Sequence, residues 1–209
     1  MVDITAIDRL LQPYAKLDEQ QLRLTSIYID LLLKWNARIN LTAVRDADEI
    51  VTRHFGESFF AAGILRSQAV PQNAIDVGSG AGFPGIPLAI SMPHIQVTLI
   101  ESNQKKSTFL REVISALKLK NVAVFSGRGE DYPDQADLVT MRAVERFEKA
   151  LATAIELVEP GGRIALMIGA SQAVLAKALS KDVEWNQPAA VPVGHSRILL
   201  VGTKEVKVG

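Results

Sequence analysis

The segment DVGSGAGFPGIP, residues 76–87, contains four glycines between positions 78 and 85. Apolar residues precede and follow it, a pattern typical of a turn between a buried strand and a buried helix. Glycine reaches positive φ angles and has no Cβ, so such a backbone can lie against a ligand. Pro84 and Pro87 suit the first turn of a helix, where a missing N–H costs nothing. The segment therefore predicts a backbone cradle for a nucleotide-like ligand.

The glycines fit two ligand-binding patterns. Gly80-x-Gly82-x-x-Gly85 matches the fingerprint of dinucleotide-binding enzymes. Gly78-x-Gly80-x-Gly82, with Asp76 two residues ahead, is the pattern of S-adenosylmethionine enzymes. A carboxylate at Asp76 would repel a pyrophosphate, but it could accept a hydrogen bond from a ligand ammonium, directly or through water. Asp76 thus favours S-adenosylmethionine, which carries an ammonium and a sulfonium and no phosphate.

Later acidic positions extend the predicted cofactor site. Glu101 closes the apolar run HIQVTLIE, 19 residues after Gly82, where a carboxylate grips ribose hydroxyls in both cofactor classes. Gly129 and Glu130 follow a further β-rich run, and a backbone N–H beside an acidic side chain can bind the adenine edge. Residues 157–167, LVEPGGRIALM, predict a helix, a Pro-Gly-Gly turn and a strand, an order common in class I methyltransferases. Together with Asp76, these features favour a methyltransferase.

The absence of certain residues narrows the methyl acceptor. The chain has no cysteine, and methylation of pyrimidine C5 usually proceeds through a covalent cysteine adduct. The position after the expected fourth strand reads TMRA, without the Pro-Pro motif that commonly serves exocyclic amino groups. An acceptor that must lose a proton would want a base, for which His54 is a candidate, although helix packing explains this histidine equally well. Guanine N7 already has a free lone pair, and Arg142 could stack on the base or donate to its O6. The residues permit guanine N7 without selecting it.

The N-terminal part of the chain has the periodicity of helices. Asp18 with Gln21 predicts a capping box that opens one helix, and Asp46 with Glu49 predicts a second. The first helix is expected to bury one face, formed by Leu24, Ile27, Tyr28, Leu31, Leu32 and Trp35. Trp35 suits this apolar face better than a stack with a nucleic-acid base. The connector between the helices, WNARINLTAVRDADE, is rich in asparagine and arginine.

Beyond Pro71, short β-rich runs alternate with helical runs, which predicts βαβ units on a parallel sheet with helices on both faces. The expected strands are residues 73–77, 95–101, 121–125, 137–141, 163–168 and 197–203. Residues 184–193 contain two prolines and are expected as an edge strand or a loop. We therefore predict an N-terminal helical extension over residues 1–68 and a Rossmann-like α/β domain over residues 69–209.

Composition limits the other classes of function. The chain has 209 residues with 23 basic and 23 acidic side chains, so its net charge is zero and nucleic-acid binding must depend on local clusters. His54, His94 and His195 show no ligand spacing, which argues against a metal site. No apolar run reaches the roughly 18 residues of a membrane span, and the N-terminus lacks a signal-peptide pattern. We expect a cytoplasmic, monomeric protein with no membrane partner.

Five segments carry a more specific signal: WNARINLTAVRDADEIVTRHFGES, AIDVGSGAGFPGIPLAI, LIESNQKKSTFLREV, SGRGED and MRAV. They resemble the bacterial RsmG family, also called GidB, over about residues 20–170 and, more weakly, around Arg197. The phrases NLT and GFPGIP within them are much more specific than a bare GxGxG. Members of this family methylate N7 of a guanine in 16S ribosomal RNA. The resemblance implies a Rossmann-like class I methyltransferase with an N-terminal helical extension. It also implies S-adenosylmethionine as the cofactor and 16S rRNA or a small-subunit ribosomal particle as the partner.

The resemblance also implies which residues hold the cofactor. They are Asp76, Gly78, Ser79, Gly80, Gly82 and Phe83 in the glycine segment, and Glu101, Gly129, Glu130 and Arg142 beyond it. Arg142 is also the candidate catalytic residue. Its partner is expected to be the substrate or, alternatively, Glu145 or Asp137 in an ion pair within the chain.

Basic residues are expected around the RNA. They are Arg38, Arg53, His54, Lys105, Arg128 and Arg197. Lys105 follows Glu101 closely and is preferred to the neighbouring Lys106, which suits a solvated helix face. Family members often have Leu-Lys-Gly where this chain has MIG, so Ile168 stands in place of a lysine.

Three other functions remain open. A methyltransferase that acts on a small molecule or a protein would use the same fold, although the basic connector favours RNA. A nicotinamide-dependent oxidoreductase fits the glycines but not Asp76. A binding module without catalysis is kept open by Ile168.

Overall fold

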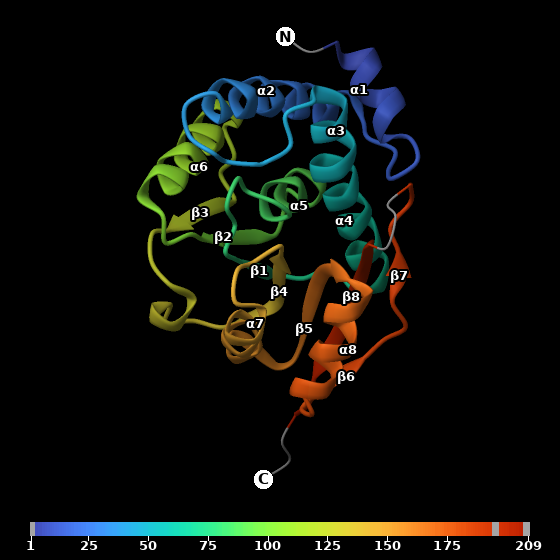
Figure 1. Ribbon diagram of the computed structural model, residues 1–209, viewed down its shortest axis with the longest axis vertical. Coiled ribbons are helices and arrows are strands. Elements are labelled where there is room, and N and C mark those ends of the chain that lie inside the picture. Colours follow the sequence, from blue (N-terminus) through green and yellow to red (C-terminus); the bar gives the residue numbers. More distant parts are fainter. Residues whose placement is uncertain (1–2, 194–196, 207–209) are drawn as a thin grey trace.

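The computed structural model describes residues 3–193 and 197–206, so His195 lies outside the described residues (Figure 1). Its strands are β1 (Asn73–Val77), β2 (Gln96–Ile100), β3 (Val122–Phe125), β4 (Ala136–Arg142), β5 (Val158–Gly169), β6 (Val183–Trp185), β7 (Ala189–Ala190) and β8 (Arg197–Lys204). Within the described chain they form a sheet of order β3-β2-β1-β4-β5-β8-β6, and β7 pairs with β8. Strands β1 to β5 run parallel, and β8 is antiparallel to β5. The predicted α/β fold is confirmed.

Helices cover both faces of this sheet. They are α1 (Ile4–Leu11), α2 (Glu19–Asn36), α3 (Ala47–Ile50), η1 (Val51–Gly56), α4 (Glu57–Gln68), α5 (Gly85–Ser91), α6 (Gln104–Leu117), η2 (Gly129–Asp131), α7 (Phe147–Glu156) and α8 (Ala170–Leu179). In Figure 1, α2, α4, α5 and α6 lie on one side of the sheet and α7 and α8 on the other, each set over its own apolar cluster. Within the described ranges, no helix is long and apolar enough to cross a membrane, and no cluster of acidic and histidine side chains is arranged to hold a metal ion.

The N-terminal helices share an apolar cluster with the sheet. Ile7 of α1, Tyr28 of α2 and Phe59 of α4 pack in the same cluster as Leu99 of β2 and Leu138 of β4. The helical run ends at residue 68 and the first strand begins at residue 73. The division of the chain into a helical extension and a Rossmann-like domain at residues 68 and 69 stays a prediction.

The buried face of α2 differs in part from the predicted one. Tyr28 and Leu32 are buried as expected, but Ile27 is 37% exposed. The buried stripe also includes Thr25 and Asn36, whose polar atoms are hydrogen-bonded within the chain. Leu24, Leu31 and Trp35 are partly buried against the core, so the predicted face is largely correct and only Ile27 departs from it. Satisfied polar groups can occupy a core face, which the apolar residues alone did not indicate. The predicted capping box at the start of α2 is confirmed.

The second predicted helix contains an irregular segment. Asp46 caps it by accepting from the backbone N–H of Glu49, which is one half of the predicted capping box, while the Glu49 side chain pairs with Arg53. The run α3-η1-α4 then changes to π-helical geometry over Val51–Gly56. Short π segments inside α-helices occur frequently at functional sites. This one carries Arg53 and His54, two of the predicted RNA-binding residues.

Two strand predictions need correction. A Pro-Gly-Gly turn was expected to end before the strand at residue 163, but β5 begins at Val158 and contains that tripeptide. Its pairing with β4 shifts register there, because several residues of β5 bulge out opposite Ala136 and Leu138. Residues 184–193 form neither one strand nor a plain loop, since β6 and β7 are short strands that both pair with β8.

Candidate active site

A cavity of about 850 Å³ opens at the carboxyl-terminal ends of strands β1, β2 and β4. The strand order reverses between β1 and β4, which is where open α/β sheets bind ligands. We call one part the loop end, lined by Gly78, Ser79, Gly80, Glu101, Gly129 and Glu130. We call the other part the arginine end, lined by Arg53, His54, Phe83, Arg142 and Arg197. Most of the predicted cofactor-binding residues lie at the loop end, and half of the predicted RNA-binding residues lie at the arginine end.

The glycine segment bends sharply at the loop end. Gly78, Gly80 and Gly82 have φ angles of 68°, 57° and 90°, which residues with a Cβ rarely adopt. A Cβ on Gly80 would meet nothing nearer than 3.8 Å, whereas a Cβ on Gly82 would overlap the hydroxyl of Tyr28. That hydroxyl donates a hydrogen bond to the carbonyl of Ala81. Gly80 therefore leaves space at the cavity, and Gly82 lets α2 pack against the back of the loop.

Asp76 lies behind the loop and not in the cavity. Its side chain is buried, with one oxygen accepting from the backbone N–H of Gly85 at 3.2 Å and the other from the Thr140 hydroxyl at 2.8 Å. Burial raises the pKa of this carboxyl to about 6. Neither Asp76 nor Gly82 lines the cavity, and the expected contact of Asp76 with a ligand ammonium, directly or through water, stays a prediction. Asp76 instead joins β1, β4 and the start of α5.

Glu101 faces the cavity from the end of β2. One oxygen accepts from the backbone N–H of Gly80 at 2.8 Å and the other from that of Asn103 at 2.7 Å. An ionised carboxylate has about four acceptor positions, so Glu101 can still accept from ligand hydroxyls. Gly129 and Glu130 border the same space, and an ion pair with Lys149 at 2.8 Å lowers the pKa of Glu130. This arrangement of acceptors and open backbone fits a ribose next to Glu101 and an adenine next to Gly129.

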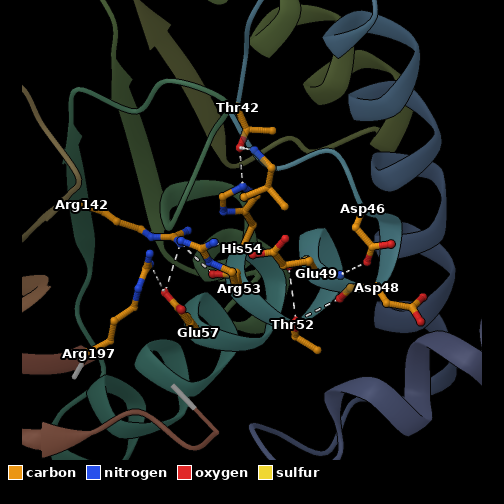
Figure 2. Close-up of polar contacts among 11 residues, drawn as sticks. Thr42, Asp46, Asp48, Glu49, Thr52, Arg53, His54, Glu57, Arg142 and Arg197 are labelled. Atoms are coloured by element: carbon orange, nitrogen blue, oxygen red, sulfur yellow. Dashed lines mark hydrogen bonds and ion pairs between the residues drawn. The ribbon is translucent and has the colours of Figure 1, made fainter. Parts of the chain in front are cut away.

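One buried carboxylate organises the arginine end (Figure 2). Oε2 of Glu57, the first residue of α4, accepts from Nη2 of Arg142 at 3.1 Å and from Nη1 of Arg197 at 2.9 Å. Nη2 of Arg142 also donates to the backbone carbonyl of Arg53 at 2.7 Å. The ion-pair partner of Arg142 is therefore Glu57, and the expectation of Glu145 or Asp137 was wrong. Asp137 is already engaged, because its carboxylate accepts from backbone N–H groups just before and at the start of β1.

Sequence reasoning missed Glu57. Its signal was a charged residue three positions after His54 in an otherwise apolar helical stretch, where a solvated carboxylate is out of place. The side chain is 4% exposed. A carboxylate buried to this degree needs a cationic partner, and its two partners lie 85 and 140 residues further along the chain.

Arg142 combines a buried charge with an unused donor. Its side chain is 6% exposed, and Nε has no hydrogen-bond partner among the described residues. Its guanidinium lies 6.0 Å from the ring centroid of Phe83. Burial lowers the pKa of Arg142 to about 10, which leaves it cationic at neutral pH. An orphaned buried donor at a cavity wall is costly unless a ligand accepts from it.

His54 is neutral in this site. Burial, aided by the charges of nearby arginines, lowers its pKa to about 3. Nε2 lies 2.7 Å from the Thr42 hydroxyl, and the ring stacks on Phe83 with centroids 5.1 Å apart. Nδ1 has no partner among the described residues. A group with so low a pKa is a weak general base, which favours an acceptor that needs no deprotonation.

The remaining predicted basic residues divide into two groups. Arg128 lines the cavity with Arg53 and Arg197. Arg38 and Lys105 are exposed and do not line it. Lys106 lines it in place of Lys105, so the preference for Lys105 was wrong as far as the cavity is concerned. Successive helical side chains differ by about 100° in direction. In the first turn of α6, Lys106 therefore points to the cavity and Lys105 does not.

Ile168 packs in the core. It is 6% exposed, lies opposite Ile198 of β8 and belongs to the apolar cluster on the α7 and α8 side of the sheet. It does not line the cavity. This position therefore contributes no polar group to the site of this chain.

Comparison of the structure with solved proteins indicates the fold. The chain is similar to a ribosomal protein L11 methylase from Lactobacillus delbrueckii subsp. bulgaricus, with a TM-score of 0.61 and 15% identity over 72% of this chain and 80% of that one. It is also similar to TYW2 from M. jannaschii in complex with AdoMet, with a TM-score of 0.53 and 20% identity over 69% of this chain and 75% of that one. The predicted Rossmann-like methyltransferase fold is confirmed.

Comparison of the sequence indicates the family. The chain is 37% identical over 202 residues to the ribosomal RNA small subunit methyltransferase G of Chloroflexus aggregans, which covers 90% of this chain and 84% of the relative. It is 43% identical over 144 residues to the protein of the same name from Xanthomonas campestris pv. campestris, which covers 68% of this chain and 66% of the relative. The family model GidB, rRNA small subunit methyltransferase G, matches residues 21–197. The chain belongs to the GidB family of rRNA small subunit methyltransferases.

Proposed function

We propose that this protein transfers the methyl group of S-adenosylmethionine to N7 of a guanine in 16S rRNA, the guanine 527 on which the family acts. The observation that carries the proposal is the shared cavity, which is lined by a carboxylate and open glycine backbone and also by a neutral histidine and a buried arginine, Arg142. The first group suits the cofactor, and the second suits a base that already has a lone pair. S-adenosylmethionine would supply an electrophilic methyl group on a sulfonium.

The residues of the chain then have separate tasks. Glu101 would accept from the ribose hydroxyls, and the backbone at Gly80 would border the methionine part of the cofactor. Arg142 would donate to O6 of the guanine or to a neighbouring phosphate. No side chain is required to remove a proton, because N7 attacks with its free electron pair. The contribution of the chain is to hold nucleophile, methyl carbon and sulfur in line.

The zero net charge of the chain bears on the form of the substrate. Proteins that bind naked RNA tightly gain much of their affinity from the release of counterions. Here the basic groups at the cavity are local and are partly neutralised by Glu57. We expect weak binding to free 16S rRNA and better transfer to a small-subunit particle, where RNA shape adds specificity.

The test uses ribosomal RNA from cells that lack the gene. The purified protein and S-adenosylmethionine are incubated with small subunits and with free 16S rRNA from those cells. Reduction and aniline cleavage then reveal N7-methylguanine. We expect cleavage at one new guanine in treated material, and calorimetric binding of S-adenosylmethionine but not of NAD. Unchanged cleavage in both substrates would refute the proposed acceptor, and binding of NAD alone would refute the cofactor.

A further inference from the structure

We propose that Glu57 is a positioning residue for methyl transfer: it occupies Nη2 of Arg142, so that Arg142 can orient the acceptor guanine without binding N7. The inference rests on the proposed function. Glu57 makes no contact with cofactor or acceptor in this account and acts through Arg142.

The first step is the geometry of the guanidinium. A guanidinium presents two edges with parallel donors, one formed by Nε with Nη2 and the other by Nη1 with Nη2. Nη2 has two protons. In this structure one is donated to the Arg53 carbonyl at 2.7 Å and the other to Oε2 of Glu57 at 3.1 Å (Figure 2). Both two-donor edges of Arg142 are therefore blocked, and single donors remain at Nε and Nη1.

The second step is the chemistry of guanine. Arginine most often binds this base through O6 and N7 together, with both donors of one edge. Such a contact would place an N–H on the N7 lone pair, which is the electron pair needed for attack on the methyl carbon. An Arg142 limited to single donors can hold O6 and leave N7 free. Nε of Arg142 is buried and has no hydrogen-bond partner among the described residues, and the residue lines the cavity, so Nε is the donor that we assign to this contact.

The third step is the charge at the arginine end. Arg53, Arg142 and Arg197 surround this part of the cavity, and Glu57 pairs with the last two through the same oxygen. Arg197 is 35% exposed, while Arg142 is 6% exposed. Without the carboxylate, the two guanidinium groups would repel each other and the exposed one would turn to solvent. The buried one would then offer a complete edge to the base.

The main test is the substitution Glu57→Met, which keeps the length of the side chain and removes both its charge and the oxygen that accepts from Nη2 of Arg142. We expect kcat on unmethylated small subunits to fall about 100-fold, as for a misplaced reacting group. The KM for the subunits should not rise, and the affinity for S-adenosylmethionine should stay within twofold. A purely structural role would instead weaken cofactor binding or raise KM together with the loss of rate. Glu19→Met is the matched control, because it makes the same change in an exposed ion pair with Arg23 on α2.

A second variant keeps the test decisive if Glu57→Met does not fold. Glu57→Met with Arg197→Met removes one negative and one positive charge together and is compared with Arg197→Met alone. The double variant should again be about 100-fold slower in kcat than its control. Equal kcat values in either comparison, or a loss matched by weaker cofactor binding, would overturn the role of Glu57. Absence of transfer by the unaltered protein would instead refute the proposed function and is seen before any variant is measured.

Discussion

The two ends of the cavity are built in different ways. At the loop end, Glu101 accepts hydrogen bonds from backbone groups 21 and 2 residues away. At the arginine end, Glu57 binds side chains that lie 85 and 140 residues away. The loop end is formed mainly by backbone donors around a turn. The arginine end exists only when three distant segments have packed together. Changes at the loop end should therefore alter cofactor binding and stability, and changes at the arginine end should alter transfer.

The largest expected effect separates the two ends. Arg142→Ala should slow methyl transfer about 100- to 1,000-fold, the loss typical when one oriented donor is removed from a reacting centre. Binding of S-adenosylmethionine should remain within twofold, because Arg142 belongs to the arginine end. Lysine should rescue poorly, since it lacks the planar guanidinium. The measurements are single-turnover transfer and calorimetry, with Arg23→Ala on the exposed face of α2 as the control. Normal transfer by Arg142→Ala would remove this residue from the site.

Two glycines test the loop end. Gly82→Ala should destabilise the fold by about 3 kcal/mol, because the new Cβ combines a positive φ with overlap of the Tyr28 hydroxyl. Gly80→Ala meets no atom closer than 3.8 Å and should cost about 1 to 2 kcal/mol, from its φ alone. Urea unfolding measures both. Equal losses of stability in the two variants would contradict the different packing that we assign to these glycines.

Asp76 distinguishes support of the loop from contact with a ligand. Asp76→Asn leaves a donor facing Gly85 N–H or Thr140 Oγ1, and we expect a loss of about 1 to 3 kcal/mol in stability. The affinity for S-adenosylmethionine should fall with it, because the loop loses its anchor. Thermal melting and calorimetry on the same samples test this link. Loss of affinity with unchanged melting would support the direct ligand contact that the sequence suggested.

The smallest effect concerns protonation of His54. Unfolded histidine takes up a proton as the pH falls below about 6.5, whereas folded His54 does so only near pH 3. Stability is therefore lost as the pH falls from 6.5 toward 3. Between pH 7 and pH 5.5 the wild type should lose about 1 kcal/mol more than His54→Gln. Urea unfolding at both values measures the difference. Parallel losses would mean that His54 titrates normally.

The sequence predicted the loop end more fully than the arginine end. Glycine spacing and strand-end carboxylates follow from local backbone geometry, so Gly78, Gly80 and Glu101 were placed correctly at the cavity. The strands of the parallel sheet could also be predicted from the sequence, since each is a short apolar run. The sequence did not indicate that Asp76 lies behind the loop, because spacing does not tell which way a strand-end side chain points.

The arginine end could not be predicted to the same depth. Glu57 and Arg197 come together only because the first residues of α4 and β8 meet beside Arg142 at the end of β4, and nothing in the local pattern of either segment encodes that contact. The π-helical turn before Glu57 and the choice between Lys105 and Lys106 are likewise matters of packing and rotation. Residue types identified these groups as basic or acidic, but only the tertiary structure pairs them.

The hydrogen bond from Tyr28 to the Ala81 carbonyl also constrains how the chain is made. Tyr28 lies 6.3 Å from Phe109 of α6, measured between ring centroids, so α2 finds its final partners well after it has left the ribosome. A nascent chain that stops before α6 would leave uncovered the part of α2 that packs on Phe109, although Phe55 and Phe83 already contact Tyr28. Exposed apolar surface of this kind favours aggregation. We therefore expect the N-terminal helices to complete their packing only after α6 has been made.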